Sequence, residues 1–215
     1  MRLDIPFYPN PPKNDSQCLS VSCLSLISYF TEKNPSLDEV DALLHRKKGH
    51  WTYTLQLATV LHDAGLDVKY FSSVDPTPFL EGESYFRDHF PEKAENIIAH
   101  TNVPVLISSI AQLVQYKLFQ KKILDAEELE IHLQQGHGII LLVDGNIILG
   151  NEGPFQKQAI VLTGYDKMNF FFHHSGADFP TPHMIVPKKR LLDAWNAPGT
   201  DNDVIIVYGK RANRR

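Results

Sequence analysis

The spacing of apolar residues changes character at Gly136, and this change most constrains the fold. Before Gly136 apolar residues recur at helical spacing, whereas after it short apolar or aromatic runs alternate with turn residues. Helices first and strands later favour an α+β fold over a repeating βαβ fold. The predicted helices span 17–30, 37–44, 54–64, 105–118, 126–135 and 191–195, and the predicted strands span 68–71, 139–143, 146–149, 159–163, 169–173 and 204–208.

Some stretches are less regular. Ile5 to Tyr8 reads as a short extended segment closed by prolines, residues 75–102 are rich in aromatic and charged residues, and residues 105–107 also fit a strand. A length of 215 residues suits one domain. We therefore expect a single domain over 1–215, with a helical half of about 1–136 and a sheet half of about 137–209.

Charge and cysteine content narrow the class of protein. The net charge of −4 gives no general reason to bind nucleic acid or an anionic membrane. Residues 1–12 lack the apolar core of a signal peptide, and no apolar run reaches membrane-spanning length. Cys18 and Cys23 are badly placed for a disulfide on one helix, which suits a reducing compartment. We predict a cytoplasmic protein that binds neither nucleic acid nor membrane.

Cys18 is the first candidate for chemistry, because it stands at the start of a predicted buried helix. The residues at 14–16, Asn-Asp-Ser, are candidate caps for that helix. The N–H groups and partial positive charge of a helix N-terminus favour a thiolate, and together with the side chain of Gln17 they can form an oxyanion hole. The alternative is that Cys18 is a small buried hydrophobe, as we expect for an inert Cys23.

Four segments then resemble known families. The opening over 3–30, with Gln17-Cys18 heading its helix, looks like the start of C39-like cysteine peptidase domains. Trp51-Thr-Tyr-Thr-Leu55 and Gly199-Thr-Asp-Asn-Asp203 resemble elements of the related guanylyl-cyclase-like family, and Ala159-Ile-Val-Leu-Thr-Gly-Tyr-Asp166 resembles the histidine strand of both. The resemblance implies a papain-like cysteine peptidase fold, with N-terminal helices packed on a C-terminal antiparallel sheet and a cleft between them.

The catalytic positions depart from this family pattern. Gln158 stands where the family usually has the catalytic histidine, and His174 stands at the usual aspartate, followed by Ser175 in place of proline. Leu19 replaces the glycine that commonly follows the cysteine, and Thr54 replaces an aspartate. The inherited set of cysteine, histidine and aspartate therefore reads Cys18, Gln158 and His174.

Two readings of the site follow. In one, Cys18 is the nucleophile of an amide hydrolase or acyl transferase, Gln17 the oxyanion donor, His174 the base and Gln158 its orienting group. His173 competes as base, but strand alternation places it on the opposite face from His174. In the other, the domain has lost catalysis and binds a peptide or protein partner in the same cleft. Neither reading needs a cofactor or metal, and no histidine shows metal-ligand spacing.

Overall fold

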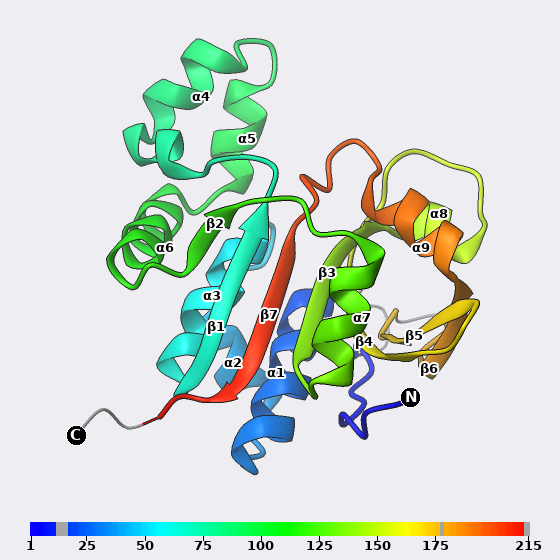
Figure 1. The fold of residues 1–215 in the computed structure, drawn as a ribbon. Coiled ribbons are helices and arrows are strands. Elements are labelled where there is room, and N and C mark those ends of the chain that lie inside the picture. Colours follow the sequence, from blue (N-terminus) through cyan, green and yellow to red (C-terminus); the bar gives the residue numbers. More distant parts are fainter. Residues whose placement is uncertain (12–16, 177–178, 213–215) are drawn as a thin grey trace.

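The computed structural model describes residues 1–11, 17–176 and 179–212. Within these residues seven strands form one sheet, in the order β2-β1-β7-β3-β4-β5-β6, with helices on both faces (Figure 1). The β1–β2 pair is parallel and every other neighbouring pair is antiparallel. The strands are β1 (Leu66–Ser72), β2 (Phe119–Lys121), β3 (Gly138–Asp144), β4 (Lys157–Tyr165), β5 (Asn169–His174), β6 (Thr181–Pro187) and β7 (Val204–Lys210).

Two sets of helices enclose the sheet. In Figure 1, α1 and α3 lie behind it and α7 in front, while α4 and α5 project beyond the end of β1. This arrangement confirms the mixed α+β class with a largely antiparallel sheet. The helices are α1 (Cys18–Thr31), α2 (Leu37–Leu43), α3 (Thr54–Asp63), the 3₁₀ helix η2 (Thr77–Glu81), α4 (Glu83–His89), α5 (Ala94–His100), α6 (Val103–Gln115), α7 (Ala126–Gln134), α8 (Gly145–Leu149) and α9 (Lys188–Trp195).

The two faces of the sheet bury separate hydrophobic cores. On β4, Ala159 and Val161 pack into the core shared with α1, α3 and α6, which we call the α1-side core. Ile160 and Leu162 pack into the core shared with α7 and α9, which we call the α9-side core. Successive side chains of a strand point to opposite faces, so this alternation decides toward which core each candidate site residue points.

Helix α1 begins at Cys18, as the sequence predicts, and its first eleven residues are buried. Nearly all side chains of α1 are apolar or small, so the helix can lie between the sheet and the other helices. The helix ends where Glu32 adopts a left-handed conformation, with φ of 60°. The expected cap at 14–16 lies outside the described residues.

The strand expected at Asn146–Leu149 is wrong, because these residues belong to helix α8. The Asp144 side chain accepts a hydrogen bond from Asn146 N at 2.9 Å, which caps the start of the helix. Gly150 ends it in the left-handed region, with φ of 76°. Both capping residues were visible in the sequence, but the short apolar run between them also fits a strand.

Several elements were not expected. Residues 75–102 contain η2, α4 and α5, and the short strand β2 follows α6. Residues 105–107 belong to helix α6, so the helix expected there is confirmed and the alternative strand is wrong. Strand β6 was missed because it carries Pro182 and Pro187, which a strand tolerates at the edge of a sheet. Because β1 and β2 precede residue 136, the sheet draws on both parts of the chain rather than on the later part alone.

The expected pairing of the strands that carry Gln158 and residues 170–174 is confirmed. β4 and β5 are adjacent and antiparallel, with Val161 opposite His173 and Leu162 opposite Phe172. The turn at 166–169 joins them, with Asp166 accepting hydrogen bonds from Met168 N and Asn169 N at 2.8 and 2.7 Å. The alignment that places Gln158 and His174 in the family pattern is therefore consistent with the fold.

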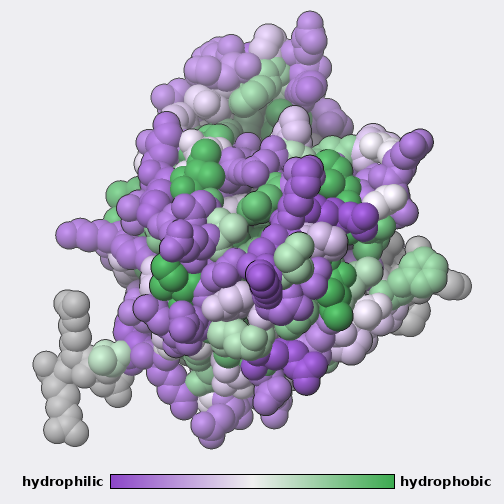
Figure 2. Space-filling model, turned by 45° about the vertical axis from the view of Figure 1, so that its right-hand side comes forward, coloured by the Kyte–Doolittle hydropathy of each residue, from purple (hydrophilic) through white to green (hydrophobic). Residues whose placement is uncertain are grey.

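The surface offers no broad apolar face in the view of Figure 2. Hydrophilic residues predominate there, and hydrophobic residues appear as separate spots between them. Among the residues that the structure describes, no helix combines the length and apolar character needed to cross a membrane.

Candidate functional site

Cys18 is placed at the junction of α1 and β4. Its side chain is 6% exposed, and its sulfur accepts a hydrogen bond from Ala159 N at 3.4 Å. Burial raises the pKa of the thiol, and the N–H of Ala159, the positive charge of Lys157 and the N–H of Leu19 lower it only in part. The thiol is therefore protonated at neutral pH.

Cys23 lies deeper in the same helix. It is fully buried, and burial raises the pKa of its thiol far above the ordinary value. The expected burial of Cys23 is thus confirmed.

Gln17 directs its amide toward α2. Its Nε2 donates to Asp41 Oδ2 at 2.7 Å. Asp41 Oδ2 also lies 3.5 Å from Arg46 Nη1. One N–H of the predicted oxyanion donor is therefore used within the fold, and its role as a donor to a substrate stays a prediction.

Gln158 and His174 are on neighbouring strands, but neither is joined to Cys18. Gln158 Nε2 donates to Ala159 O at 3.2 Å, and the Nδ1 of His174 donates to Phe179 O at 3.0 Å. The His174 ring packs edge-on to Phe172, which belongs to the α9-side core. Across the described chain, no hydrogen bond links the Cys18 sulfur to a histidine ring.

His173 points to the other face of β5, as strand alternation predicts. Its Nε2 donates to Ile5 O at 2.8 Å, and its Nδ1 accepts from His183 N at 3.2 Å. Burial lowers the pKa of His173 to about 4, so the ring is neutral at pH 7. His173 therefore holds the N-terminal extended segment against the sheet.

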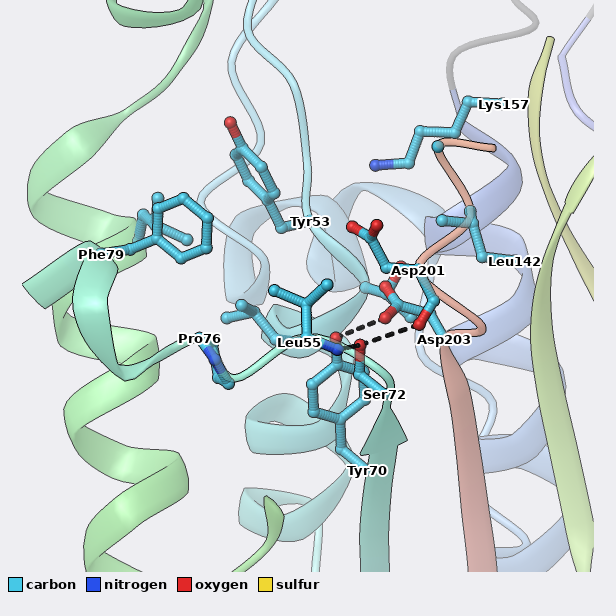
Figure 3. Close-up of a pocket in the computed structure, with 14 residues that line it drawn as sticks. Tyr53, Leu55, Tyr70, Ser72, Pro76, Phe79, Leu142, Lys157, Asp201 and Asp203 are labelled. Carbon is cyan, nitrogen blue, oxygen red and sulfur yellow. Dashed lines mark hydrogen bonds between the residues drawn. The ribbon is translucent and has the colours of Figure 1, made fainter. Parts of the chain in front are cut away.

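A cavity of about 180 Å³ opens at the end of the sheet where β1 and β3 finish and β4 and β7 begin. Figure 3 shows the side chains that line it. Cys18 itself is not among the residues that line it, so the cavity does not lie at the sulfur, where the cleft was expected, but near Lys157 on β4. Ala159 contacts the sulfur, and Lys157, two residues earlier on the same face, lines the cavity.

The cavity has an apolar side and a charged side. Figure 3 shows Pro76 and Phe79 on one side and Lys157, Asp201 and Asp203 on the other. The apolar side is completed by three further residues, Leu55, Val74 and Leu106.

Asp203 is the buried carboxylate of the charged side. Tyr70 Oη donates to Asp203 Oδ1 at 2.6 Å. Burial raises the pKa of Asp203 to about 6, against the effect of hydrogen bonds and of the positive Lys157, which lower it. A buried, ionised carboxylate is costly unless it has a positive partner.

Among the described residues that line the cavity, Lys157 is the only cation. Its Nζ donates to Thr52 O at 3.2 Å and lies 5.4 Å from the centre of the Tyr53 ring. Although the residue is exposed, desolvation of the ammonium lowers its pKa, and the charges of Asp203 and Cys18 raise it. Lys157 thus links the thiol to the cavity electrostatically.

Sequence reasoning missed Lys157, Tyr70, Asp201 and Asp203 as site residues. The two aspartates stand in the Gly-Thr-Asp-Asn-Asp run, which indicated only the fold. Lys157 directly precedes Gln158, so this site residue stands one position before the place where the family pattern has its histidine. Tyr70, in the middle of β1, gave no local signal. Among the described residues no group of three or more His, Cys, Asp or Glu side chains could hold a metal ion.

Comparison with solved structures identifies the class of fold. A C39-like peptidase from Bacillus anthracis superposes with a TM-score of 0.58 at 10% identity, covering 97% of this chain and 96% of that one. The peptidase domain of Streptococcus ComA, a bifunctional ABC transporter of a quorum-sensing pathway, gives 0.49 at 11% identity, covering 93% and 96%. The chain has the papain-like fold of C39-like peptidases.

The family follows from the sequence model that matches. The model described as guanylylate cyclase matches residues 13–207, and the chain belongs to that family. Among curated proteins, no sequence matches this chain.

Proposed function

We propose that this chain is a non-catalytic member of the C39-like peptidase fold that binds a peptide in the cavity beside Cys18. The observation that carries the proposal is the state of the cysteine. Its thiol is buried, accepts a hydrogen bond from Ala159 N at 3.4 Å and has a raised pKa. A cysteine nucleophile needs an adjacent base or a lowered pKa, and in the described residues no imidazole bonds the sulfur.

The cavity supports the binding half of the proposal. Concave sites that combine an apolar lining with a few convergent polar groups and perturbed pKa values are typical ligand sites. Here the apolar residues of η2, α3 and α6 face Lys157, Asp201 and Asp203 across the cavity. Such a site holds a ligand without any step at the sulfur.

A second candidate function is Cys18-dependent hydrolysis or acyl transfer on an amide. It is favoured by the positive charge of Lys157, which lowers the pKa of the Cys18 thiol. In this reading Cys18 is the nucleophile and Gln17 an oxyanion donor. His174, with Gln158 orienting it, has to leave Phe179 O and its contact with Phe172 of the α9-side core to act as base, because Cys18 belongs to the α1-side core. The hydrogen bonds of Gln17 and His174 therefore have to rearrange before catalysis.

The two functions are separated by the Cys18→Ser variant. A mixed peptide library is incubated with wild type and with Cys18→Ser, and both cleavage and retention of peptides are measured by mass spectrometry. The non-catalytic proposal expects the same peptides retained intact by both proteins. Cleavage by wild type that disappears in Cys18→Ser would refute it and establish the hydrolase.

A further inference from the structure

The cavity combines features that define the chemistry of its ligand. Among the described residues, its charged side carries two carboxylates, Asp201 and Asp203, and one ammonium, Lys157, so this part of the lining holds one excess negative charge when all three are ionised. A ligand with a single positive charge balances it. A zwitterion or an acidic ligand would leave the buried Asp203 carboxylate without enough positive charge nearby.

The apolar side lies directly across from these charges. Phe79, Val74 and Leu106, from three different segments, give this half of the cavity an apolar lining. The ligand must therefore carry an apolar group within a few bonds of its positive group. At about 180 Å³, the cavity is smaller than the pockets of about 300–1,000 Å³ that hold drug-sized ligands. One amino-acid residue fits this size.

The polar groups also leave capacity for a ligand. Lys157 Nζ carries three N–H donors, of which one is used by Thr52 O. Thr54, 2% exposed, lines the cavity, and its hydroxyl makes no hydrogen bond of ordinary geometry, although it lies near enough to Asp203 to lower the pKa of that carboxyl. A hydroxyl both donates and accepts hydrogen bonds, so Thr54 keeps capacity for a ligand beside Asp203.

We propose that the cavity binds the N-terminal residue of a peptide with an apolar side chain. The α-ammonium lies between the carboxylates of Asp201 and Asp203, the side chain lies against Phe79 and its neighbours, and the first peptide carbonyl accepts a hydrogen bond from Lys157. The proposal rests on the proposed function, because it names the ligand of the same site.

The test uses three probes and the full chain in calorimetric titrations at pH 7.5. They are Leu-Gly-Gly-amide, its N-acetyl form, which lacks the positive charge, and Gly-Gly-Gly-amide, which lacks the apolar side chain. We expect both altered peptides to bind at least tenfold more weakly than Leu-Gly-Gly-amide. Equal binding of the acetylated peptide, or no binding of any probe, would overturn the ammonium site.

Variants assign the effect to the cavity. Asp201→Asn removes one negative charge and should weaken binding of Leu-Gly-Gly-amide about tenfold, while binding of the acetylated peptide stays unchanged. The backbone should keep its conformation, because asparagine tolerates the φ of 54° at this position. The control Asp193→Asn, which removes the same charge from the exposed face of α9, should bind like wild type. Loss of binding in the control as well would remove the assignment to Asp201.

Failure of the proposed function gives a different result. Mass spectrometry of the titrated samples shows whether Leu-Gly-Gly-amide stays intact. Cleavage would refute the non-catalytic proposal, and the ammonium site would then be judged by whether the acetylated peptide is cleaved at least tenfold more slowly. An intact peptide bound without preference for the free N-terminus would refute the ammonium site alone.

Discussion

Ala159 N donates a hydrogen bond to the sulfur of Cys18, 3.4 Å away, and among the described residues no imidazole bonds this thiol, as the base of a cysteine enzyme does. The contact joins the start of α1 to the start of β4. It also places Lys157, on the same face of β4, between the thiol and the cavity.

Reactivity of Cys18 should depend on Lys157 and not on His174. Lys157 lowers the pKa of the thiol, so Lys157→Met should raise that pKa and slow alkylation by iodoacetamide between pH 7 and 9. Below the pKa each unit changes the thiolate fraction about tenfold. The rates are measured by mass spectrometry, with Cys18 modified before the fully buried Cys23.

His174→Ala is the companion variant. His174 donates to Phe179 O, and in the described residues it makes no bond to the sulfur. Cys18 in the His174→Ala variant should therefore be alkylated at the wild-type rate across pH 6 to 9. A slower rate in His174→Ala would support the second candidate function, with His174 as base.

Asp203→Asn should change how stability depends on pH. The pKa of Asp203 rises from its ordinary 3.8 to about 6 on folding, mainly through burial. The folded state therefore holds a proton that the unfolded state releases, and the wild-type free energy of unfolding falls by about 2 kcal/mol as pH rises from 4 to 7 through this group. Asp203→Asn lacks this loss, so its stability relative to wild type should increase over that window.

Urea denaturation of both proteins at pH 4, 5, 6 and 7 measures the difference. The Asp193→Asn variant, which removes a carboxylate from the exposed face of α9 rather than from the cavity, serves as the control. A constant difference for Asp203→Asn would mean that its carboxyl is not perturbed by burial.

Helix α8 should depend on the side chain of Asp144. This carboxylate accepts from Asn146 N at 2.9 Å and from Gln156 N at 3.3 Å. Asp144→Ala removes both bonds and should cost about 1–2 kcal/mol of unfolding free energy. Asp144→Asn keeps an acceptor oxygen and should cost less, so equal losses in the two variants would argue against capping. Chemical denaturation at pH 7 compares them.

Gly164 should be needed for docking of the N-terminal segment. A Cβ there would overlap Met1 O and lie 2.8 Å from Arg2 Cα. Gly164→Ala should break the bond from Leu3 N to Thr163 O, now 2.7 Å, and cost about 1–3 kcal/mol. Hydrogen exchange measures the loss of protection at the Leu3 amide. Unchanged protection would show that the segment adapts.

Local pattern in the sequence determined much of the fold. The start of α1 at Cys18, the burial of Cys23 and the adjacency of β4 and β5 all follow from apolar spacing and turn residues, which act between near neighbours in the chain. Local pattern was not enough at Asn146–Leu149, because a run of four residues fits a strand or one turn of a helix equally well. The hydrogen bond from Asn146 N to the Asp144 side chain favours the helix.

Only the tertiary structure decided the site. Cys18, Lys157 and Asp203 are far apart in the sequence, and they meet because α1, β4 and β7 pack around one end of the sheet. Whether a cysteine is an activated thiolate or a buried thiol depends on its burial and on the charges brought near it, and residue identity alone fixes neither. The sequence therefore determined that a cysteine heads the central helix, and the packing of β4 against it decided that the amide N–H of Ala159 bonds its sulfur.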